Sequence, residues 1–374
     1  MRQKAVGTFR SVTGSWSTVI LKALDNRLVR PSLWRLPPLT PSAPPDEVKR
    51  ILVIRPGGLG DAILLLPALI VLKEAYPQAA LVVLAEARNA QAFSLLPFHC
   101  RVIDYTSPVQ LLSLLTGPAF DLVIDTEQWY GLSALVARMV RGRFKLGFGT
   151  NFRGRCFHRA LDYSYYEYEV EAFFRLLKPL GIEPPCWWEM VPFRYPSGKR
   201  ISSGPLAAIF PGASHPSRRW GKERFLEVAR FLVGKGWKVA VVGGPGEVED
   251  GAYISSRLPP GKAFDYTGST SLIKTAEVLA SCRFIVTADS GIMHLAWLLG
   301  VSTLSLFGPG IVEKWAPRGP QHLAVRLNLS CSPCTRFGMV PPCPHDYYCM
   351  RGLSSQMVIE ALEEFLLRLR TYLT

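Results

Sequence analysis

The chain has 374 residues, of which 48% are hydrophobic and 19% charged, so it can bury a large core and global disorder is excluded. Lys and Arg number 43 against 29 Asp and Glu, and the formal charge of +14 favours anionic partners such as phosphorylated substrates, nucleic acid or an acidic membrane surface. The longest apolar run near the front, residues 62–72, is about half of the roughly 20 residues that a membrane span needs, which argues against an integral membrane protein.

Residues 1–49 differ from the rest of the chain. The first 35 residues carry seven Lys or Arg and a single acid, Asp25. Apolar residues share one helical face, with polar positions such as Asp25 between them: Trp16, Val19, Ile20, Ala23, Leu24 and Leu28. A basic amphipathic helix of this kind lies either on an anionic membrane surface or on the flank of its own protein. The Pro-rich stretch 37–45 predicts an extended linker.

Regular alternation of strands and helices begins at Arg50 and indicates parallel βαβ units. The predicted strands are Ile51–Ile54, Ala80–Ala85, Arg101–Asp104 and Asp121–Asp125. The predicted helices are Ala62–Ala75, Asn89–Leu96 and Leu111–Leu115.

Pro and Gly crowd residues 181–205, which predicts a domain boundary, and the alternation then starts again. The second set of strands is Leu206–Phe210, Lys238–Val242, Phe284–Thr287 and Ser302–Leu306. The second set of helices is Lys222–Val233, Leu272–Ser281 and Gly291–Leu299. Ser354 or Ser355 could cap a last helix whose apolar side carries Val358, Leu362, Phe365, Leu366 and Leu369. The chain therefore predicts an α/β protein with two doubly wound domains, 50–195 and 196–374, facing each other across a cleft at the carboxyl ends of their strands.

The first motif that carries chemistry follows the first strand and runs from Arg55 to Asp61. Its glycines, Gly57, Gly58 and Gly60, let the backbone approach a ligand, and the start of a helix favours negative charge. The spacing is not that of the dinucleotide fingerprint. Asp61 at the helix start either accepts a proton from a substrate or is a plain helix cap.

Three further motifs follow strands of the second domain. The loop 210–220 offers backbone N–H groups, Ser214 and Arg218, which suit a phosphate or diphosphate, although a solvated loop is equally compatible with it. The turn 242–249 ends in carboxylates, and a Glu at such a place can bind ribose hydroxyls. In the segment 287–294, open N–H groups and a hydroxyl at a helix mouth again suit a phosphate, while His294 one turn later is functional or structural. The chain has no D-x-D pair that would clamp a divalent cation on a diphosphate.

Taken in order, these motifs resemble glycosyltransferase family 9, the ADP-heptose–lipopolysaccharide heptosyltransferases. The resemblance runs from about Ile51 to the end of the chain. It is carried by Arg55–Asp61 with Pro67-Ala68-Leu69, Phe120–Asp125, Pro211–Trp220, Gly243-Gly244-Pro245, Asp289-Ser290-Gly291 with His294, and Phe307-Gly308-Pro309 before Trp315.

The resemblance implies a GT-B fold of two Rossmann-like domains, with the acceptor on the first and the nucleotide sugar on the second. It implies inverting, metal-independent transfer without a cofactor, with ADP-heptose as donor and Asp61 as general base. The residues on the donor side would then be Ser214, Arg218, Glu249, Asp289, Ser290, Gly291 and His294. Glu249 would hold the ribose, and Arg55 is a candidate on the acceptor side. Arg218 stands where the family commonly has Lys, which keeps the charge and changes the hydrogen-bond geometry.

The segment 331–349 also resembles a tail seen in many family members. Its four cysteines, Cys331, Cys334, Cys343 and Cys349, could hold a structural zinc ion, form two disulfides or stay free. The other cysteines are scattered, which is typical of reduced thiols in the cytoplasm.

The expected partners are a nucleotide sugar, a lipid-linked anionic glycan acceptor and the inner face of the cytoplasmic membrane, on which a monomer would lie peripherally; nucleic acid is not expected. Two other functions stay open. One is a GT-B enzyme that uses another nucleotide sugar for a different surface glycan. The other is a non-catalytic, nucleotide-binding protein associated with the membrane, against which Asp61 argues.

Overall fold

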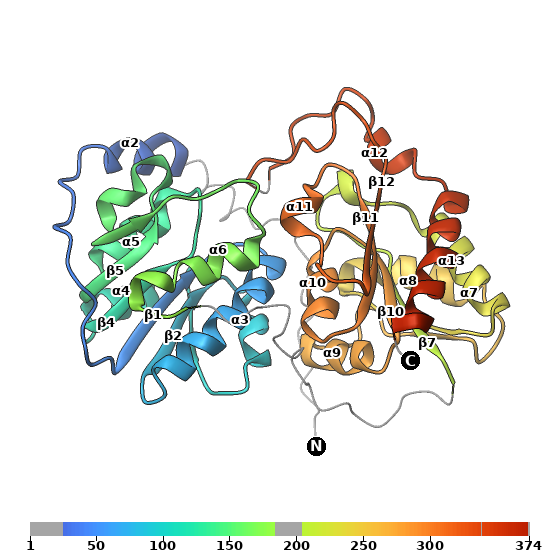
Figure 1. Cartoon of the computed structure of the whole chain (residues 1–374), viewed down its shortest axis with the longest axis horizontal. Helices are drawn as coiled ribbons and strands as arrows, with labels where there is room; N and C mark the ends of the chain where they lie inside the picture. Colours follow the sequence, from blue (N-terminus) through green and yellow to red (C-terminus); the bar gives the residue numbers. More distant parts are fainter. Residues whose placement is uncertain (1–24, 184–203, 338, 373–374) are drawn as a thin grey trace, which may run out of the picture.

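The computed structural model describes residues 25–183, 204–337 and 339–372, and these form two parallel six-stranded sheets with helices on both faces. We call residues 25–183 the N-terminal half and residues 204–372 the C-terminal half. In Figure 1 the N-terminal half lies on the left and the C-terminal half on the right, and α3 and α10 lie toward the middle. The predicted boundary between residues 195 and 196 falls outside the described residues.

The first sheet has the strand order β3-β2-β1-β4-β5-β6. Its strands are β1 (Arg50–Arg55), β2 (Ala80–Ala85), β3 (Arg101–Asp104), β4 (Phe120–Asp125), β5 (Gly142–Phe148) and β6 (Arg159–Leu161). The helices and helical turns of this half are η1 (Asp25–Val29), α2 (Arg30–Leu33), α3 (Leu59–Ala75), η2 (Ala90–Leu95), α4 (Pro108–Thr116), α5 (Gly131–Met139), η3 (Thr150–Cys156), α6 (Glu169–Arg175) and η4 (Lys178–Leu180).

The second sheet has the order β12-β11-β10-β7-β8-β9. Its strands are β7 (Leu206–Phe210), β8 (Lys238–Val241), β9 (Ala263–Asp265), β10 (Phe284–Ala288), β11 (Ser302–Phe307) and β12 (His322–Arg326). The helical segments of this half are η5 (Pro216–Arg218), α7 (Lys222–Gly234), η6 (Pro245–Glu247), α8 (Val248–Ser255), α9 (Leu272–Ala280), α10 (Gly291–Leu298), α11 (Val312–Trp315), α12 (Tyr348–Arg351) and α13 (Ser355–Tyr372).

Both sheets follow the same doubly wound order. Counted within each half, the strands run 3-2-1-4-5-6, and every pair in both sheets is parallel. In this order the chain reverses its winding direction between β1 and β4, and again between β7 and β10. Ligands bind in the crevice beyond the carboxyl ends of the strands at such a point. We therefore expect the motifs after β1, β4, β7 and β10 to bind ligands in these two crevices.

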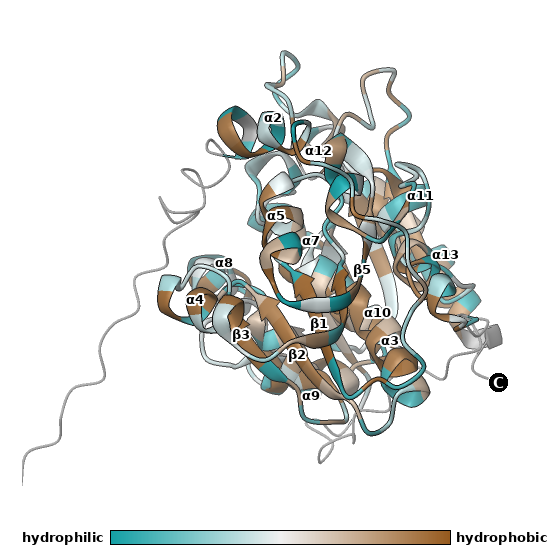
Figure 2. Cartoon of the chain, turned by 90° about the vertical axis from the view of Figure 1, so that its left-hand side faces the viewer, coloured by the Kyte–Doolittle hydropathy of each residue, from teal (hydrophilic) through white to brown (hydrophobic). Residues whose placement is uncertain are grey.

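One buried cluster extends through both halves, because α3 and α10 pack against each other between the sheets. α3 is apolar on all sides, and its residues from Ala62 to Leu69 are buried. The cluster continues through Leu295 and Ala296 of α10 into the second sheet. Figure 2 shows the brown, hydrophobic colour along the strands and along the helices next to them. The helices α3 and α10, which follow the first and the fourth strand of their sheets, thus share one hydrophobic core.

Most of the predicted elements are present, with ends shifted by one to three residues. α3 begins at Leu59 instead of Ala62, so Asp61 lies inside its first turn. The predicted helix Asn89–Leu96 is instead the 3-10 segment η2. The side chain of Ser354 accepts a hydrogen bond from Met357 N (3.2 Å) at the start of α13, as a cap does.

Several elements were not predicted, and β5 shows why. This strand carries Lys145 in its centre, which reads as a break in a buried strand. The lysine is 6% exposed, and its ammonium donates to the backbone oxygens of Arg138 (2.5 Å) and Val140 (2.7 Å). Burial lowers the pKa of Lys145 to about 8. Hydrogen bonds from the ammonium to carbonyl oxygens at the end of α5 therefore permit a polar residue that the sequence pattern argues against.

The predicted amphipathic N-terminal helix lies mostly outside the described residues. Its end is described, and there the polarity is opposite to what the flank alternative, with the apolar face packed on the protein, would require. Asp25 is buried against α5, while Leu28 from the apolar face is 63% exposed. The reason is that Asp25 accepts a hydrogen bond from the N-terminus of α5. Within the described part of the chain, no helix is long and apolar enough to cross a membrane.

Candidate active site between the two sheets

A cavity of about 800 Å³ lies between the carboxyl ends of the two sheets. Its wall in the N-terminal half includes the loop after β1 with Asp61, and its wall in the C-terminal half includes the residues after β7 and β10. Most of the residues predicted from the motifs line it: Arg55, Gly57, Gly58, Gly60, Asp61, Ser214, Arg218, Asp289, Ser290, Gly291 and His294. The fold therefore brings together groups that are separated by more than two hundred positions in the sequence.

The glycine-rich loop after β1 needs glycine at two positions. Gly57 has φ +111°, a conformation that strains any side chain, and its N–H donates to Glu86 Oε1 (3.0 Å). A Cβ on Gly60 would lie 2.8 Å from the ring of His294 and 3.5 Å from Gly291 Cα. The first turn of α3 therefore contacts the first turn of α10, and Asp61 lies at this junction.

Arg55 is buried beneath the loop and pairs with a carboxylate from the next switch-point strand. Its Nη2 lies 3.2 Å from Glu127 Oε2, and its Nη1 and Nε donate to Thr126 O and Pro56 O, both at 2.9 Å. Glu127 also accepts from Trp129 N (3.0 Å). With these bonds in place, the guanidinium is a rigid part of the cavity wall, and its charge faces the Asp61 side.

The first turn of α10 presents groups that the sequence predicted for the donor side. The Ser290 side chain caps the helix by accepting a hydrogen bond from Met293 N (3.4 Å). Asp289 just before it is 4% exposed, and its Oδ2 lies 3.4 Å from Arg218 Nη1. A Cβ on Gly310 would lie 2.4 Å from Asp289 Oδ2, so this glycine leaves room for the carboxylate.

Three buried polar groups lie near this helix mouth, and two of them, Arg218 and Asp289, form the ion pair described above. Among the described residues, Arg218 Nε, Asp289 Oδ2 and His294 Nδ1 make no hydrogen bond. Burial lowers the pKa of His294 to about 4, so the imidazole is neutral at pH 7. Unpaired buried polar groups are costly, and a polar ligand in the cavity would supply their partners.

The carboxylate expected at the third motif is replaced by its neighbour. Glu249 is 86% exposed, pairs with Lys222 on the outer surface (2.5 Å) and does not line the cavity. Glu247 lines it instead, and its Oε2 accepts from Gly244 N (2.9 Å). Gly212 packs directly on Glu247, since a Cβ there would lie 2.4 Å from Oε1. The prediction of Glu249 as a cavity residue is therefore wrong in position by two residues.

Aromatic side chains form the wall that covers the N-terminal half of the cavity. Trp129, Tyr163 and Tyr165 come from this half, and Phe337 reaches over from the Cys-rich segment of the other. The rings of Trp129 and Phe337 stack with centroids 3.9 Å apart, and Phe337 lies 5.0 Å from Tyr165. Tyr165 Oη also donates to Thr335 O. The Cys-rich segment thus closes over the cavity from the opposite half.

Lys314 and Glu169 form a buried ion pair between the halves, 2.7 Å apart and 2% and 0% exposed. Lys314 lines the cavity from α11, and Glu169 begins α6. Burial, with a further contribution from the Glu169 carboxylate, raises the pKa of Tyr163, so the phenol donates to Glu169 Oε2 (2.7 Å). Gln128 donates to the other oxygen of Glu169.

The four clustered cysteines are free thiols. In the described part of the chain, no three His, Cys, Asp or Glu side chains are placed to hold a metal ion. The zinc ion and the two disulfides weighed from the sequence stay predictions. Burial raises the pKa of Cys334 and of Cys349, which reduces their thiolate character.

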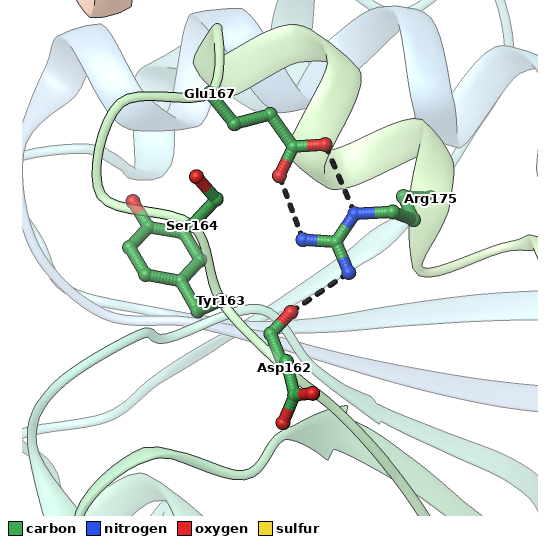
Figure 3. A pocket seen from close by; sticks show the side chains of 5 residues that line it. All are labelled: Asp162, Tyr163, Ser164, Glu167 and Arg175. Carbon is green, nitrogen blue, oxygen red and sulfur yellow. Dashed lines mark hydrogen bonds and ion pairs between the residues drawn. The ribbon is translucent and has the colours of Figure 1, made fainter.

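A smaller cavity of about 420 Å³ lies behind Tyr163 on the N-terminal half (Figure 3). Two of its charged residues, Arg175 and Glu167, are paired with each other. Arg175 donates to both oxygens of Glu167 at 2.9 and 2.6 Å and to Asp162 O at 2.7 Å. This arrangement braces the loop that carries Tyr163.

Sequence reasoning missed Glu127, Glu247, Lys314 and the aromatic wall. Glu127 could have been found from the sequence, because it follows the end of β4. This strand lies beside β1 at the switch point of the sheet, and Asp61 follows β1 in the same way. Lys314 and Phe337 could not have been found in this way, because the partners that give them a role lie more than a hundred positions away in the chain.

Comparisons with known proteins agree with this geometry. The chain is similar to a lipooligosaccharide heptosyltransferase 2 of Campylobacter jejuni, 25% identical over 328 residues, which cover 84% of this chain and 98% of the relative. The solved structure of E. coli ADP-heptose lps heptosyltransferase II is similar at a TM-score of 0.64 and 25% identity, covering 85% of this chain and 99% of that one. E. coli heptosyltransferase WaaC with ADP matches at a TM-score of 0.66 and 20% identity, with 84% and 99% covered.

These neighbours confirm the predicted GT-B arrangement of two Rossmann-like halves. The family model of glycosyltransferase family 9 (heptosyltransferase) matches residues 109–341, which is more than half of the chain and includes the motifs after β4, β7, β8 and β10. On this match, with its site formed between two doubly wound sheets, the chain belongs to glycosyltransferase family 9.

Proposed function

We propose that the protein transfers a heptose from ADP-heptose to a lipid-linked acceptor of the lipopolysaccharide core. The observation that carries this proposal is the shared cavity. Asp61 lines one wall, and the guanidinium of Arg218 and the N-terminus of α10 line the other. The printed names of the relatives, heptosyltransferases of lipopolysaccharide and lipooligosaccharide, support the donor and the acceptor class.

On the acceptor side, Asp61 is the proposed general base. Its carboxylate lies in the first turn of α3, where exposed N–H groups favour negative charge, and it lines the cavity beside the buried Arg55. It would take the proton of an acceptor hydroxyl as that oxygen attacks the anomeric carbon of the donor. The bond to the ADP oxygen breaks on the opposite face, so the product has inverted configuration.

On the donor side, positive charge and N–H groups would stabilise the leaving diphosphate. Arg218 supplies a guanidinium, Ser214 a hydroxyl, and Ser290 and Gly291 the open end of α10. These groups would stabilise the diphosphate without a divalent cation, as the missing D-x-D pair led us to expect. The neutral imidazole of His294 would donate or accept a hydrogen bond near the phosphates.

Two carboxylates on the same wall suit the hydroxyls of the donor. Asp289 would bind the sugar, and we assign the ribose contact to Glu247 in place of Glu249 because only Glu247 lines the cavity. In this proposal, residues 50–195 bind the acceptor and residues 196–374 bind the nucleotide sugar.

We also propose that the enzyme acts at the inner face of the cytoplasmic membrane, where a lipid-linked acceptor would be presented. Leu28 (63%) and Trp34 (59%) are exposed near Arg27 and Arg35 at the N-terminal end of the described chain, which suits an anionic lipid surface. Sedimentation with anionic vesicles, for the full chain and for a chain without residues 1–45, tests this proposal. Equal binding of the two proteins would discard it.

The first experiment measures binding and turnover separately. A thermal-shift panel of ADP, UDP, GDP and ADP-heptose should show stabilisation by ADP and a larger one by ADP-heptose, about 2.7 kcal/mol at 100 times the dissociation constant. Thermal stabilisation by UDP or GDP alone would indicate that the enzyme uses a UDP- or GDP-sugar as its donor.

Turnover is then followed with ADP-heptose and lipopolysaccharide truncated before its heptoses. Asp61→Asn should lose at least about 100-fold in kcat and keep its thermal response to ADP, because the base acts on the acceptor and not on the nucleotide. Asp46→Asn makes the same change at an exposed site outside the cavity and should match the wild type. Full activity of Asp61→Asn would reject Asp61 as the base.

A further inference from the structure

The chain enters the N-terminal half through a short segment, Asp25–Leu36, which we call the strap. It precedes the residues that the family model matches, 109–341, and the first strand of the sheet. Leu33 is fully buried against Gly131, where a Cβ would lie 2.9 Å from Leu33 Cδ1. Arg155 Nη1 donates to the oxygen of Leu36, the last residue of the strap (2.8 Å). The second half of the strap is therefore fixed on the domain.

The first residue of the strap reaches the cavity. Asp25 lines it and is 1% exposed. Its Oδ1 accepts from Leu132 N (2.5 Å) at the start of α5, which is the role of a helix cap. Its Oδ2 has no hydrogen-bond partner among the described residues. Capping accounts for one oxygen of the carboxylate and leaves the other without a reason to be buried.

A second residue of the strap fixes the aromatic wall. The guanidinium of Arg30 lies 4.5 Å from the ring centroid of Trp129, and the same ring stacks on Phe337 at 3.9 Å. Trp129 and Phe337 both line the cavity. The stack joins the strap, the N-terminal half and the Cys-rich segment of the C-terminal half in one layer, so the strap helps to set the position of this wall.

We propose that the strap is part of the acceptor site: Asp25 accepts a hydrogen bond from a sugar hydroxyl of the glycan acceptor, and Arg30 is a positioning residue that holds Trp129. This inference rests on the proposed function, since it takes the acceptor to be a glycan. The strap contacts the half of the cavity that carries Asp61, whereas Arg218 and Asp289 lie on the opposite half. A buried carboxylate next to an aromatic wall suits a ligand with polar hydroxyls and apolar ring faces.

The test compares Asp25→Asn with Asp46→Asn, the same chemical change at an exposed position outside the cavity. Asparagine keeps an oxygen for the N-terminus of α5 and replaces an acceptor with a donor. KM is measured for truncated lipopolysaccharide and for ADP-heptose in detergent, together with the melting temperature. We expect Asp25→Asn to raise the acceptor KM about tenfold, equivalent to about 1.4 kcal/mol, and to leave the donor KM within about twofold. Arg30→Ala should shift the acceptor KM in the same direction.

Each outcome decides between the two proposals. If the wild type turns over and Asp25→Asn matches Asp46→Asn in the acceptor KM, the strap is structural and this proposal fails alone. If Asp25→Asn only lowers the melting temperature, or raises both KM values equally, Asp25 is a helix cap and nothing more. If the wild type transfers no sugar from ADP-heptose to this acceptor, the proposed function fails, and the strap proposal fails with it for this acceptor.

Discussion

At the scale of single residues, Arg218, Asp289 and His294 are buried polar groups that a ligand in the cavity could bind. Each has a buried polar atom that makes no hydrogen bond in the described part of the chain, and Asp289 keeps only its ion pair with Arg218. A buried unsatisfied group costs about 1–3 kcal/mol, so the protein holds these side chains in place at the expense of its own stability. A bound nucleotide sugar would offer phosphate and hydroxyl groups to them. These residues are thus the ones that would bind the donor under the proposed function.

The buried His294 predicts a specific pH dependence of stability. Its pKa is about 4 in the folded protein and about 6.5 in an unfolded chain, so the unfolded state binds more protons between these values. The free energy of unfolding should therefore fall as the pH falls from about 6.5 to about 4, by up to about 1.4 kcal/mol per pH unit.

Urea denaturation at several pH values in this range measures the effect. His294→Gln should flatten the profile relative to the wild type, and His345→Gln on an exposed loop serves as the control. Parallel profiles for the wild type and His294→Gln would show that the imidazole is solvated and titrates freely.

At the scale of elements, two glycines bring the first turns of α3 and α10 into contact. Gly291 would place a Cβ 3.2 Å from Gly60 N, and Gly60 would place one against His294. Each helix follows a central strand of its sheet, so both N-termini point into the cavity. Their exposed N–H groups add positive potential where a diphosphate would be released.

This close approach predicts the effect of adding one methyl group. Gly60→Ala should destabilise the protein by about 1–3 kcal/mol, because the buried ring of His294 or the backbone of α10 must shift. Gly234→Ala at the end of α7 is the matched control, since nothing lies within 4 Å of the added Cβ and alanine favours a helix. Urea midpoints that are equal for the two variants would mean that the halves are more loosely packed at this junction than the contact distances imply.

At the scale of the whole molecule, Lys314 and Glu169 tie the two halves together through buried charge. Such a pair contributes little net stability compared with apolar packing, but loss of one partner leaves an uncompensated charge in the interior. Its value here is orientation, because Lys314 also donates to Glu167 O (3.2 Å) and lies over the ring of Tyr163 (4.6 Å). The pair fixes the distance between the halves and thereby the width of the cavity.

A double-mutant cycle tests this role. Lys314→Met should cost about 3–5 kcal/mol in the free energy of unfolding, and adding Glu169→Gln should recover part of it by removing the unpaired charge. Arg318 and Glu171 form a second pair between the halves at 2.8 Å, but at 40% and 34% exposure. Arg318→Met should therefore cost only about 1 kcal/mol. If Lys314→Met and Arg318→Met lowered the free energy of unfolding equally, burial of the Lys314–Glu169 pair would not increase the cost of breaking it.

The two doubly wound halves, the place of Asp61 after β1 and the polar residues after β7 and β10 could all be predicted from the sequence alone. These features depend on local periodicity and on glycine turns at strand ends, which a chain displays before it folds. Only the tertiary structure decided that Glu247 and not Glu249 faces the cavity, because two positions on a helical turn point in different directions. It also decided that Asp25, Phe337 and Lys314 reach the site. Their partners are distant in the chain, and no spacing rule connects residues that meet only through packing.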